Sequence, residues 1–303
     1  FTWLFAEGTT SHGFETFVLL QNPDARDAVV EMTYLTPEGP VRKGTLLLEG
    51  NTRRTVNVSD DIPSRDAAIS VLADRRIIAE RSMYWDDRRG GHNSAGTTGA
   101  SAAWYLAEGS TAWGYDEYVL VANPGDVDAE VELVCMTPRG PVTPPGFTVA
   151  AGARVTVLVN EALPGSDVSV GVTSDRAVVA ERAMYWDNGT GKAGHNAMGV
   201  PQPRKECFLA EGSTGWGFEE WVLVQNPGDA PAEVSVTYLT AAGPRHRAGL
   251  TVPARGRATI DVGADLPGTD LSTRISSDVP VIAERSMYWN SRGAGHVSGS
   301  VMR

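Results

Sequence analysis

Hydrophobic and polar residues alternate in short runs along this chain, and each run ends at a sequence that favours a turn. β-branched and aromatic residues dominate the runs, as a pleated and half-buried surface prefers. No run carries a helical stripe of ten residues or more, so the pattern predicts strands almost throughout. In the first hundred residues the predicted strands are Trp3–Ala6, Thr16–Gln21, Val29–Leu35, Gly44–Leu48, Arg54–Val58, Ala68–Ala73 and Ile77–Trp85.

The whole pattern occurs three times. The sequence Ala-Glu-Gly at residues 6–8 returns at 107–109 and 210–212, and Ala-Glu-Arg-x-Met-Tyr-Trp at 79–85 returns at 180–186 and 283–289. We therefore predict three modules, each long enough to bury its own core. They are module 1 (residues 1–100), module 2 (101–203) and module 3 (204–303). Residues 94–102 are small and residues 200–204 contain two prolines, which predicts a flexible linker and a stiffer one.

About seven short strands per module favour an immunoglobulin-like β-sandwich. The likeness is one of architecture, because the Cys–Trp–Cys pattern of antibody domains is absent. A β-propeller is the competing interpretation. It needs blades of about 40–50 residues, and no second similarity appears inside each copy. The predicted fold is thus all-β, with three tandem immunoglobulin-like β-sandwich modules.

Composition excludes two classes of partner. The net charge is −11 and the basic residues are scattered, whereas nucleic-acid binders usually carry a basic patch. No apolar run approaches the roughly 20 residues needed to cross a bilayer, so this segment is expected to contain no membrane span.

The two cysteines interrupt aromatic columns of the repeat. Cys135 stands where the other copies have tyrosine, and Cys207 where they have tryptophan. Either both are unpaired, partly buried thiols, or the two columns meet across a module junction and form a disulfide. A bridge would require an oxidising compartment and a Cα separation below about 7 Å.

Charged residues recur at matching positions in every copy. Neighbours on a strand point to opposite faces, so Glu80 and Arg81 cannot share one side, and we expect Arg81 to pair with Glu7. The same reasoning pairs Glu108 with Arg182 and Glu211 with Arg285. Acid–base chemistry by two carboxylates, as in glycosidases, is the alternative. A repeated determinant of the fold is the better explanation of a threefold pattern, and no nucleophile signature is present, so we assign no catalytic residue.

One histidine per module follows the Met-Tyr-Trp strand, and we place it in a loop: His92, His195 and His296. One ligand per module is too few for zinc, which takes three or four. The histidine is expected to hydrogen-bond a backbone carbonyl or a carboxylate such as Glu7. A metal or pH-switch role is the alternative. No metal and no cofactor are predicted.

Aromatic residues are the candidate ligand contacts. Trp113 and Trp216 each precede a glycine in the first connecting loop and are expected at the surface. Trp85, Trp186 and Trp289 each follow a tyrosine at the end of the last strand, so one residue of each pair is expected to face outward. Exposed aromatics suit glycan or protein contacts; the alternative is that they fill the cores or the junctions.

The pattern Ala-Glu-Gly-x-Thr, then Asn-Pro, then Ala-Glu-Arg-x-Met-Tyr-Trp resembles uncharacterised tandem repeats of large secreted or cell-surface bacterial proteins. The resemblance covers nearly the whole chain; it implies an extracellular or cell-surface context and no ligand. We expect a non-catalytic repeat array that acts as a stalk, an adhesin segment or a subunit of a bacterial surface assembly. Its expected partners are other copies of itself, surface proteins or cell-envelope polysaccharide. A carbohydrate-binding module that uses the loop aromatics is the alternative, and an enzyme is the third hypothesis.

Overall fold

Strands provide nearly all the regular structure. The computed structural model describes residues 1–302, and each strand pairing in this range is antiparallel. The strands of module 1 lie close to the predicted ones, with one addition after the Met-Tyr-Trp sequence. They are β1 (Thr2–Phe5), β2 (Glu15–Asn22), β3 (Ala28–Thr36), β4 (Gly39–Leu48), β5 (Thr52–Asn57), β6 (Ala68–Ala73), β7 (Ile78–Trp85) and β8 (Gly90–Ala95).

Module 1 is a β-sandwich, as predicted. A sheet in the order β1-β6-β3-β4 faces a second sheet in the order β5-β2-β7-β8. The core lies between them, with Val18 and Ala79 from one sheet and Met32 and Ile69 from the other. The first two strands of an immunoglobulin constant domain pair with each other. Here β1 pairs with β6, and β2 pairs with β5 and β7, so the likeness to immunoglobulins stops at the sandwich.

Modules 2 and 3 repeat this arrangement. A single 19-residue strand, β15 or β23, replaces β6 and β7 and runs through both sheets. Module 2 contains β9 (Ser101–Leu106), β10 (Asp116–Ala122), β11 (Ala129–Thr137), β12 (Gly140–Val142), β13 (Phe147–Val149), β14 (Arg154–Leu158), β15 (Ser169–Asp187) and β16 (Lys192–Met198). Module 3 contains β17 (Arg204–Leu209), β18 (Glu219–Asn226), β19 (Ala232–Thr240), β20 (Gly243–His246), β21 (Leu250–Val252), β22 (Gly256–Asp261), β23 (Leu271–Trp289), β24 (Ala294–Gly299) and β25 (Val301–Met302).

Short helical turns occupy one matching position per module: η1 (Val58–Asp60), α1 (Val159–Ala162) and α2 (Val262–Asp265). Among residues 1–302 no helix has the length and apolar character needed to cross a membrane.

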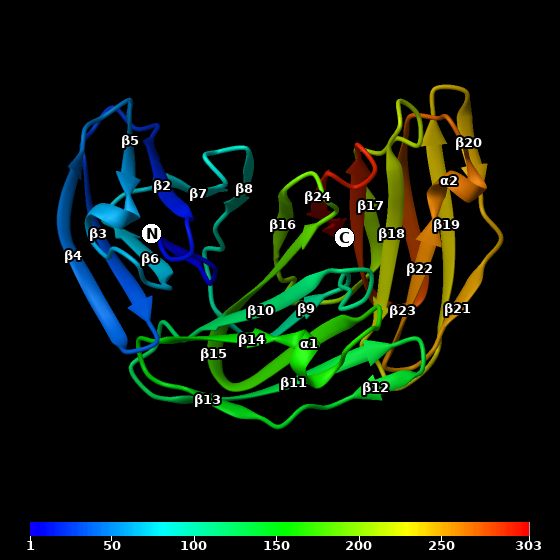
Figure 1. The fold of residues 1–303 in the computed structure, drawn as a ribbon, viewed down its shortest axis with the longest axis horizontal. Coiled ribbons are helices and arrows are strands. Elements are labelled where there is room, and N and C mark those ends of the chain that lie inside the picture. Colours follow the sequence, from blue (N-terminus) through cyan, green and yellow to red (C-terminus); the bar gives the residue numbers. More distant parts are fainter. Residues whose placement is uncertain (303) are drawn as a thin grey trace.

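The three modules lie along an arc that is open on one side, with modules 1 and 3 flanking the opening (Figure 1). Strands β8, β16 and β24 project toward the inside of the arc, where β8 packs against β16 and β16 against β24. Contact between neighbouring modules is therefore extensive.

Neither predicted linker is a free segment, and the expectation of a flexible linker at residues 94–102 was wrong. Thr97 exchanges two backbone hydrogen bonds with Leu4, and Val200 exchanges two with Tyr105. Both segments therefore pair with the first strand of their own module. In addition, side chains of module 1 join the apolar core of module 2, which couples the two sandwiches: Leu4, Ala6, Leu35 and Ala68.

The disulfide alternative is also wrong. Cys135 and Cys207 are free, buried thiols, and they lie in the separate cores of modules 2 and 3. The two columns do not meet, because each faces the interior of its own sandwich. Cys207 Sγ lies 3.9 Å from the carbonyl oxygen of Val281. Val178 is the counterpart of Val281 in module 2, and its carbonyl accepts a hydrogen bond from Trp104 Nε1 at 2.8 Å.

Candidate functional site at the module junctions

The recurring charged residues meet at the contact between modules 1 and 2. Arg81, on β7, points to the open end of its sandwich, where its Nη2 lies 2.7 Å from Glu7 Oε2. Its Nη1 donates to the Glu7 carbonyl at 2.8 Å and lies 2.7 Å from Oε2 of Glu181, on β15 of module 2. Arg81 and Glu181 are completely buried. The predicted Arg81–Glu7 pair thus exists, but it is half of a three-residue cluster shared by two modules.

Each junction joins two different surfaces. The end face is the open end of a sandwich, which in module 1 carries Glu7, Arg81 and His92. The sheet face is the outer surface of the β5-β2-β7-β8 sheet or its equivalent, which in module 2 carries Glu181 and Tyr185. Because neighbours on a strand point to opposite faces, the Glu-Arg dipeptide supplies one residue to each face of the same module.

The junction between modules 2 and 3 repeats these contacts. Arg182 Nη2 lies 3.1 Å from Glu108 Oε2, and Arg182 Nη1 lies 2.8 Å from Glu284 Oε2. The glutamate that the following module contributes also accepts a hydrogen bond from a backbone N–H of the end face. Glu181 accepts from Ala6 at 3.1 Å, and Glu284 accepts from Glu108 at 3.0 Å. The same chemistry therefore joins both pairs of modules.

A second arginine, which was not among the predicted site residues, balances the charge at each junction. Arg154 of the module 2 sheet face donates to the carbonyl of Gly8 at 2.7 Å. Arg257 of module 3 donates to Ser169 Oγ at 3.1 Å and lies 3.8 Å from Asp167. Each junction thus buries two arginines and two glutamates, which limits the cost of taking these ions out of water. The column was detectable in sequence, since arginine stands at 53, 154 and 257.

The histidines extend the network through a tyrosine of the next module. Tyr185 donates its hydroxyl to Glu7 Oε1 at 2.8 Å, and His92 Nε2 lies 3.0 Å from that hydroxyl. Since the tyrosine proton goes to the carboxylate, the histidine donates from Nε2. His195, Tyr288 and Glu108 form the same chain at 3.1 and 2.9 Å.

The environment of the histidines and of Glu7 departs from the expectation. The histidines lie on strands β8, β16 and β24 rather than in loops. Burial, followed by the Arg182 charge, holds the pKa of His195 well below its usual value. Burial alone would raise the pKa of Glu7, but His92 and Arg81 outweigh it and lower that pKa to about 2. In the described part of the chain no three His, Cys, Asp or Glu side chains are grouped to hold a metal ion.

The strand-end tryptophans are partners of the junctions. Trp85 Nε1 donates to the backbone carbonyl of Lys192 at 2.7 Å, and Trp186 Nε1 donates to the backbone carbonyl of Arg292 at 2.6 Å. The Trp85 ring packs edge-on against Tyr185, with ring centroids 5.4 Å apart. Trp85 and Trp186 are buried, so they fill the module junctions rather than standing exposed at the surface.

The third cluster is incomplete within residues 1–302. Arg285 Nη2 lies 2.8 Å from Glu211 Oε2, as in the other modules, but the Glu211 side chain is 64% exposed. His296 has no neighbouring tyrosine here, and its Nδ1 lies 3.4 Å from Arg285 Nη2. Trp289 is half-buried. At the opposite end of the arc, Glu80 of module 1 is exposed.

Two buried carboxyls stand beside the arginine clusters. Glu117 and Glu220 are buried, and within residues 1–302 the carboxyl oxygens of Glu117 have no hydrogen-bond partner. Burial raises the pKa of Glu117 to about 8 and that of Glu220 to about 7. Module 1 has Thr16 at this position, and the Thr16 hydroxyl donates to the backbone carbonyl of Thr9 at 2.5 Å. The exchange of threonine for glutamate at this position of the repeat is the sequence feature from which these two buried carboxyls could have been predicted.

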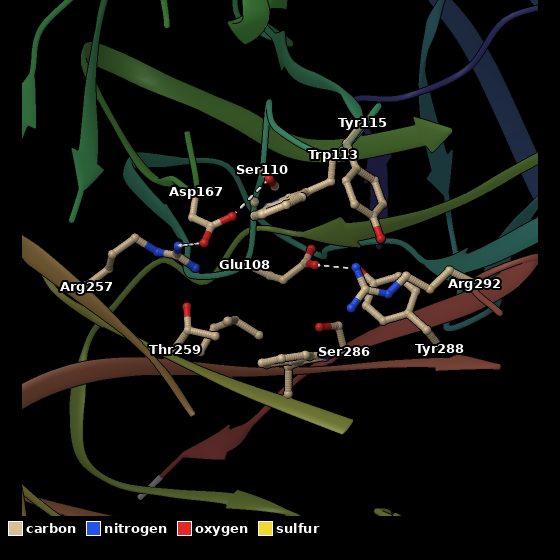
Figure 2. Close-up of a pocket in the computed structure, with 13 residues that line it drawn as sticks. Glu108, Ser110, Trp113, Tyr115, Asp167, Arg257, Thr259, Ser286, Tyr288 and Arg292 are labelled. Carbon is tan, nitrogen blue, oxygen red and sulfur yellow. Dashed lines mark hydrogen bonds and ion pairs between the residues drawn. The ribbon is translucent and has the colours of Figure 1, made fainter. Parts of the chain in front are cut away.

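A cavity of about 350 Å³ opens beside the junction of modules 2 and 3. Figure 2 shows Trp113 on one side of it and Thr259 and Ser286 on the other. Asp167 accepts from Ser110 at 3.0 Å at its edge. Trp113 is 79% exposed and has a φ of 60°. This left-handed conformation is unfavourable for a bulky residue.

The family of this chain can be stated from two matches. A family described as "Family of unknown function (DUF5719)" matches residues 82–184 and again residues 183–283. The chain belongs to the DUF5719 family. Each matched stretch runs from the Met-Tyr-Trp strand of one module into the Met-Tyr-Trp strand of the next, so each match covers one period of the repeat. No curated protein is significantly similar to the sequence.

Several solved structures share partial similarity with this DUF5719 chain. Thermotoga maritima 1070 has a TM-score of 0.32 and 14% identity, over 33% of this chain and 94% of its own. The Anabaena sensory rhodopsin transducer has a TM-score of 0.24 and 30% identity, and the match covers 27% of this chain and 92% of the transducer. A tetra-tandem repeat in the extending region of a large adhesion protein has a TM-score of 0.15 and 13% identity, and the match covers 93% of this chain and 68% of that one. At these TM-scores none supports a functional conclusion.

Proposed function

We propose that this chain is a non-catalytic scaffold in which each module locks onto the next, and that it serves as part of a bacterial surface or secreted assembly. The observation that carries the proposal is the position of Arg81 between Glu7 of its own module and Glu181 of the next. Glu7 and Glu181 thus both serve as partners of Arg81 and hold the two modules together.

The burial of these charges gives the junction its specificity. A carboxylate or guanidinium taken out of water needs its partner, and removing one member of a buried pair costs about 3–5 kcal/mol. A displaced or rotated module would separate Glu181 from Arg81 and leave Arg81 with Glu7 as its remaining carboxylate partner. The interlock therefore favours a single orientation of neighbouring modules, which a spacer or scaffold requires.

Small-angle X-ray scattering tests the scaffold. The wild-type chain should have one compact, well-defined radius of gyration. The double variant Glu181→Ala/Glu284→Ala removes the incoming carboxylate at both junctions and should give a larger and broader distribution of sizes. Glu80→Ala, which changes the same column on the exposed face of module 1, is the matched control and should match wild type. Equal scattering from all three proteins would contradict the proposal.

The surface location has a separate test. Tandem sandwich modules and the resemblance of the sequence to secreted and cell-surface repeats support it. In the native bacterium, protease added to intact cells should remove the protein if it is displayed at the surface. Full protection in intact cells together with recovery in the cytosolic fraction would refute this part.

Carbohydrate binding is a second candidate, favoured by one observation. Trp113 and Trp216 are 79% and 87% exposed, and both hold the left-handed conformation with φ of 60° and 57°. Strained conformations of this kind concentrate at functional sites. A glycan array probed with wild type and with Trp113→Ala/Trp216→Ala tests it. Binding that the double variant loses would support the candidate, and the absence of binding by wild type would reject it.

A further inference from the structure

Each end of the arc presents half of a junction. Module 3 offers an end face with Arg285 and Glu211, and module 1 offers a sheet face with Arg53 and Glu80. Arg53 and Glu80 are exposed, whereas their counterparts in modules 2 and 3 are buried in complete junctions. The two complete junctions therefore show what each free half is built to hold.

The apolar contacts show the same asymmetry. At the complete junctions Leu35 and Met136 project from the end face and are buried, but Leu239 at the same position of module 3 is 45% exposed. Met136 Sδ lies 3.5 Å from Nε2 of Gln225 on the sheet face of module 3. Module 3 thus carries an apolar knob with no socket in residues 1–302.

Module 1 carries the complementary socket. A hollow of about 550 Å³ lies over its sheet face, bordered by residues that include Leu19, Gln21, Arg53, Ile78 and Glu80. Gln21 is the counterpart of Gln225, and Ile78 is 40% exposed whereas its counterpart Ile282 is fully buried. The hollow matches in position the surface on which module 3 receives Met136.

The arc curves so that modules 1 and 3 flank a common opening (Figure 1). A cavity of about 560 Å³ inside the arc is lined by residues of all three modules, including Trp85 and Arg89 of module 1 and Glu211, Arg285 and His296 of module 3. Residues of module 2, including Lys192 and His195, line the cavity between those of modules 1 and 3. The curvature of the array thus favours one additional module over a long linear continuation.

We propose that a single further module of this repeat closes the arc. Its sheet-face glutamate would pair with Arg285 and its tyrosine with Glu211, and its backbone would accept from Trp289 Nε1. Its end-face arginine would bind Glu80, and its apolar knob would fill the hollow over module 1. The closed assembly would have four junctions of one kind. This deepens the proposed scaffold function, because it uses the same interlocking contacts.

A four-module chain tests the proposal. A copy of residues 101–203 is fused after the full chain, because module 2 makes complete junctions through both of its faces. Backbone hydrogen exchange is measured at Ala210–Glu211 and at Leu19 and Ile78–Glu80, together with the radius of gyration. We expect exchange to slow at least tenfold at both free faces, in a particle hardly larger than the three-module chain. The matched control carries Glu181→Ala in the added copy only, and should lose the protection at Ala210–Glu211.

Three outcomes would overturn the proposal. Unchanged exchange at both faces would show that the halves do not engage a module. Protection at module 3 alone, in a longer particle, would show a linear array. Concentration-dependent oligomers of the unextended chain that protect both faces, abolished by Arg285→Ala, would make a second copy of the chain the occupant. Protection at Ala6 and Glu108 reports the existing junctions throughout, so failure of closure remains distinct from failure of the scaffold function.

Discussion

Arg81 and Glu181 belong to different modules, yet their side chains meet at 2.7 Å with neither accessible to solvent. Glu181→Ala would leave Arg81 buried beside Glu7 alone, and loss of one member of a buried pair costs about 3–5 kcal/mol. We expect the urea midpoint of the full chain to fall accordingly. Glu80→Ala, on an exposed member of the same column, should change stability by less than about 0.5 kcal/mol. Equal effects of the two substitutions would show that the burial of the cluster is not what stabilises the junction.

Glu117 predicts a dependence of stability on pH. Burial raises its pKa from an ordinary value of 4.5 to about 8, so the folded chain keeps a proton that the unfolded chain releases. Stability therefore falls as the pH rises from about 4.5 to about 8, because the folded state binds more protons in this window. Glu117→Gln removes the titration, and its melting temperature should decline less than that of wild type between pH 5 and pH 9. Glu132→Gln, at an exposed site, is the control and should follow wild type; a parallel decline in all three proteins would count against the assignment.

The two thiols should be inert in the folded chain. Burial raises the pKa of Cys135 to about 12 and raises that of Cys207, and the thiolate is the reactive form. A thiol reagent should label both cysteines only after denaturation, and the intact mass should be the same with and without reductant. Rapid labelling of the native chain, or a mass that rises by two hydrogen atoms on reduction, would contradict the free and buried state.

Trp216 should be dispensable for folding. Its ring is 87% exposed and its φ of 57° is costly for a residue with a Cβ atom. Trp216→Gly should therefore leave stability unchanged or raise it by up to about 1 kcal/mol. Gly217→Ala, which puts a Cβ at a φ of 83°, should destabilise the chain. If Trp216→Gly destabilised it by more than Gly217→Ala, the tryptophan would have a structural role.

Alternation and turn chemistry predicted the sandwich because both are local properties of the chain. The pairing of Arg81 with Glu7 was also predictable, since an acid and a base recur together and adjacent strand residues face opposite ways. The β8 strand was missed because Gly90-Gly91 and His92 have low strand propensity. Its position is fixed by pairing with β7 and by packing against β16, which no local pattern reports.

The repeat itself hid the most important distinction. Glu80, Glu181 and Glu284 are equivalent in sequence, but the first is exposed and the others are completely buried. The difference comes from the preceding module: modules 1 and 2 cover Glu181 and Glu284, whereas no module among residues 1–302 covers Glu80. A single-copy sequence pattern contains no information about such neighbours, so the junctions became visible only in three dimensions.

The 100 residues that separate Arg81 from Glu181 also impose an order in time. A growing polypeptide emerges from the ribosome at about 5–20 residues per second, so Arg81 waits about 5–20 seconds for the carboxylate that completes its cluster. During that interval module 1 can form its strands, but its buried guanidinium has only Glu7 as an ionic partner. Each module is therefore completed by the synthesis of the next, and assembly advances from the N-terminus one repeat behind translation.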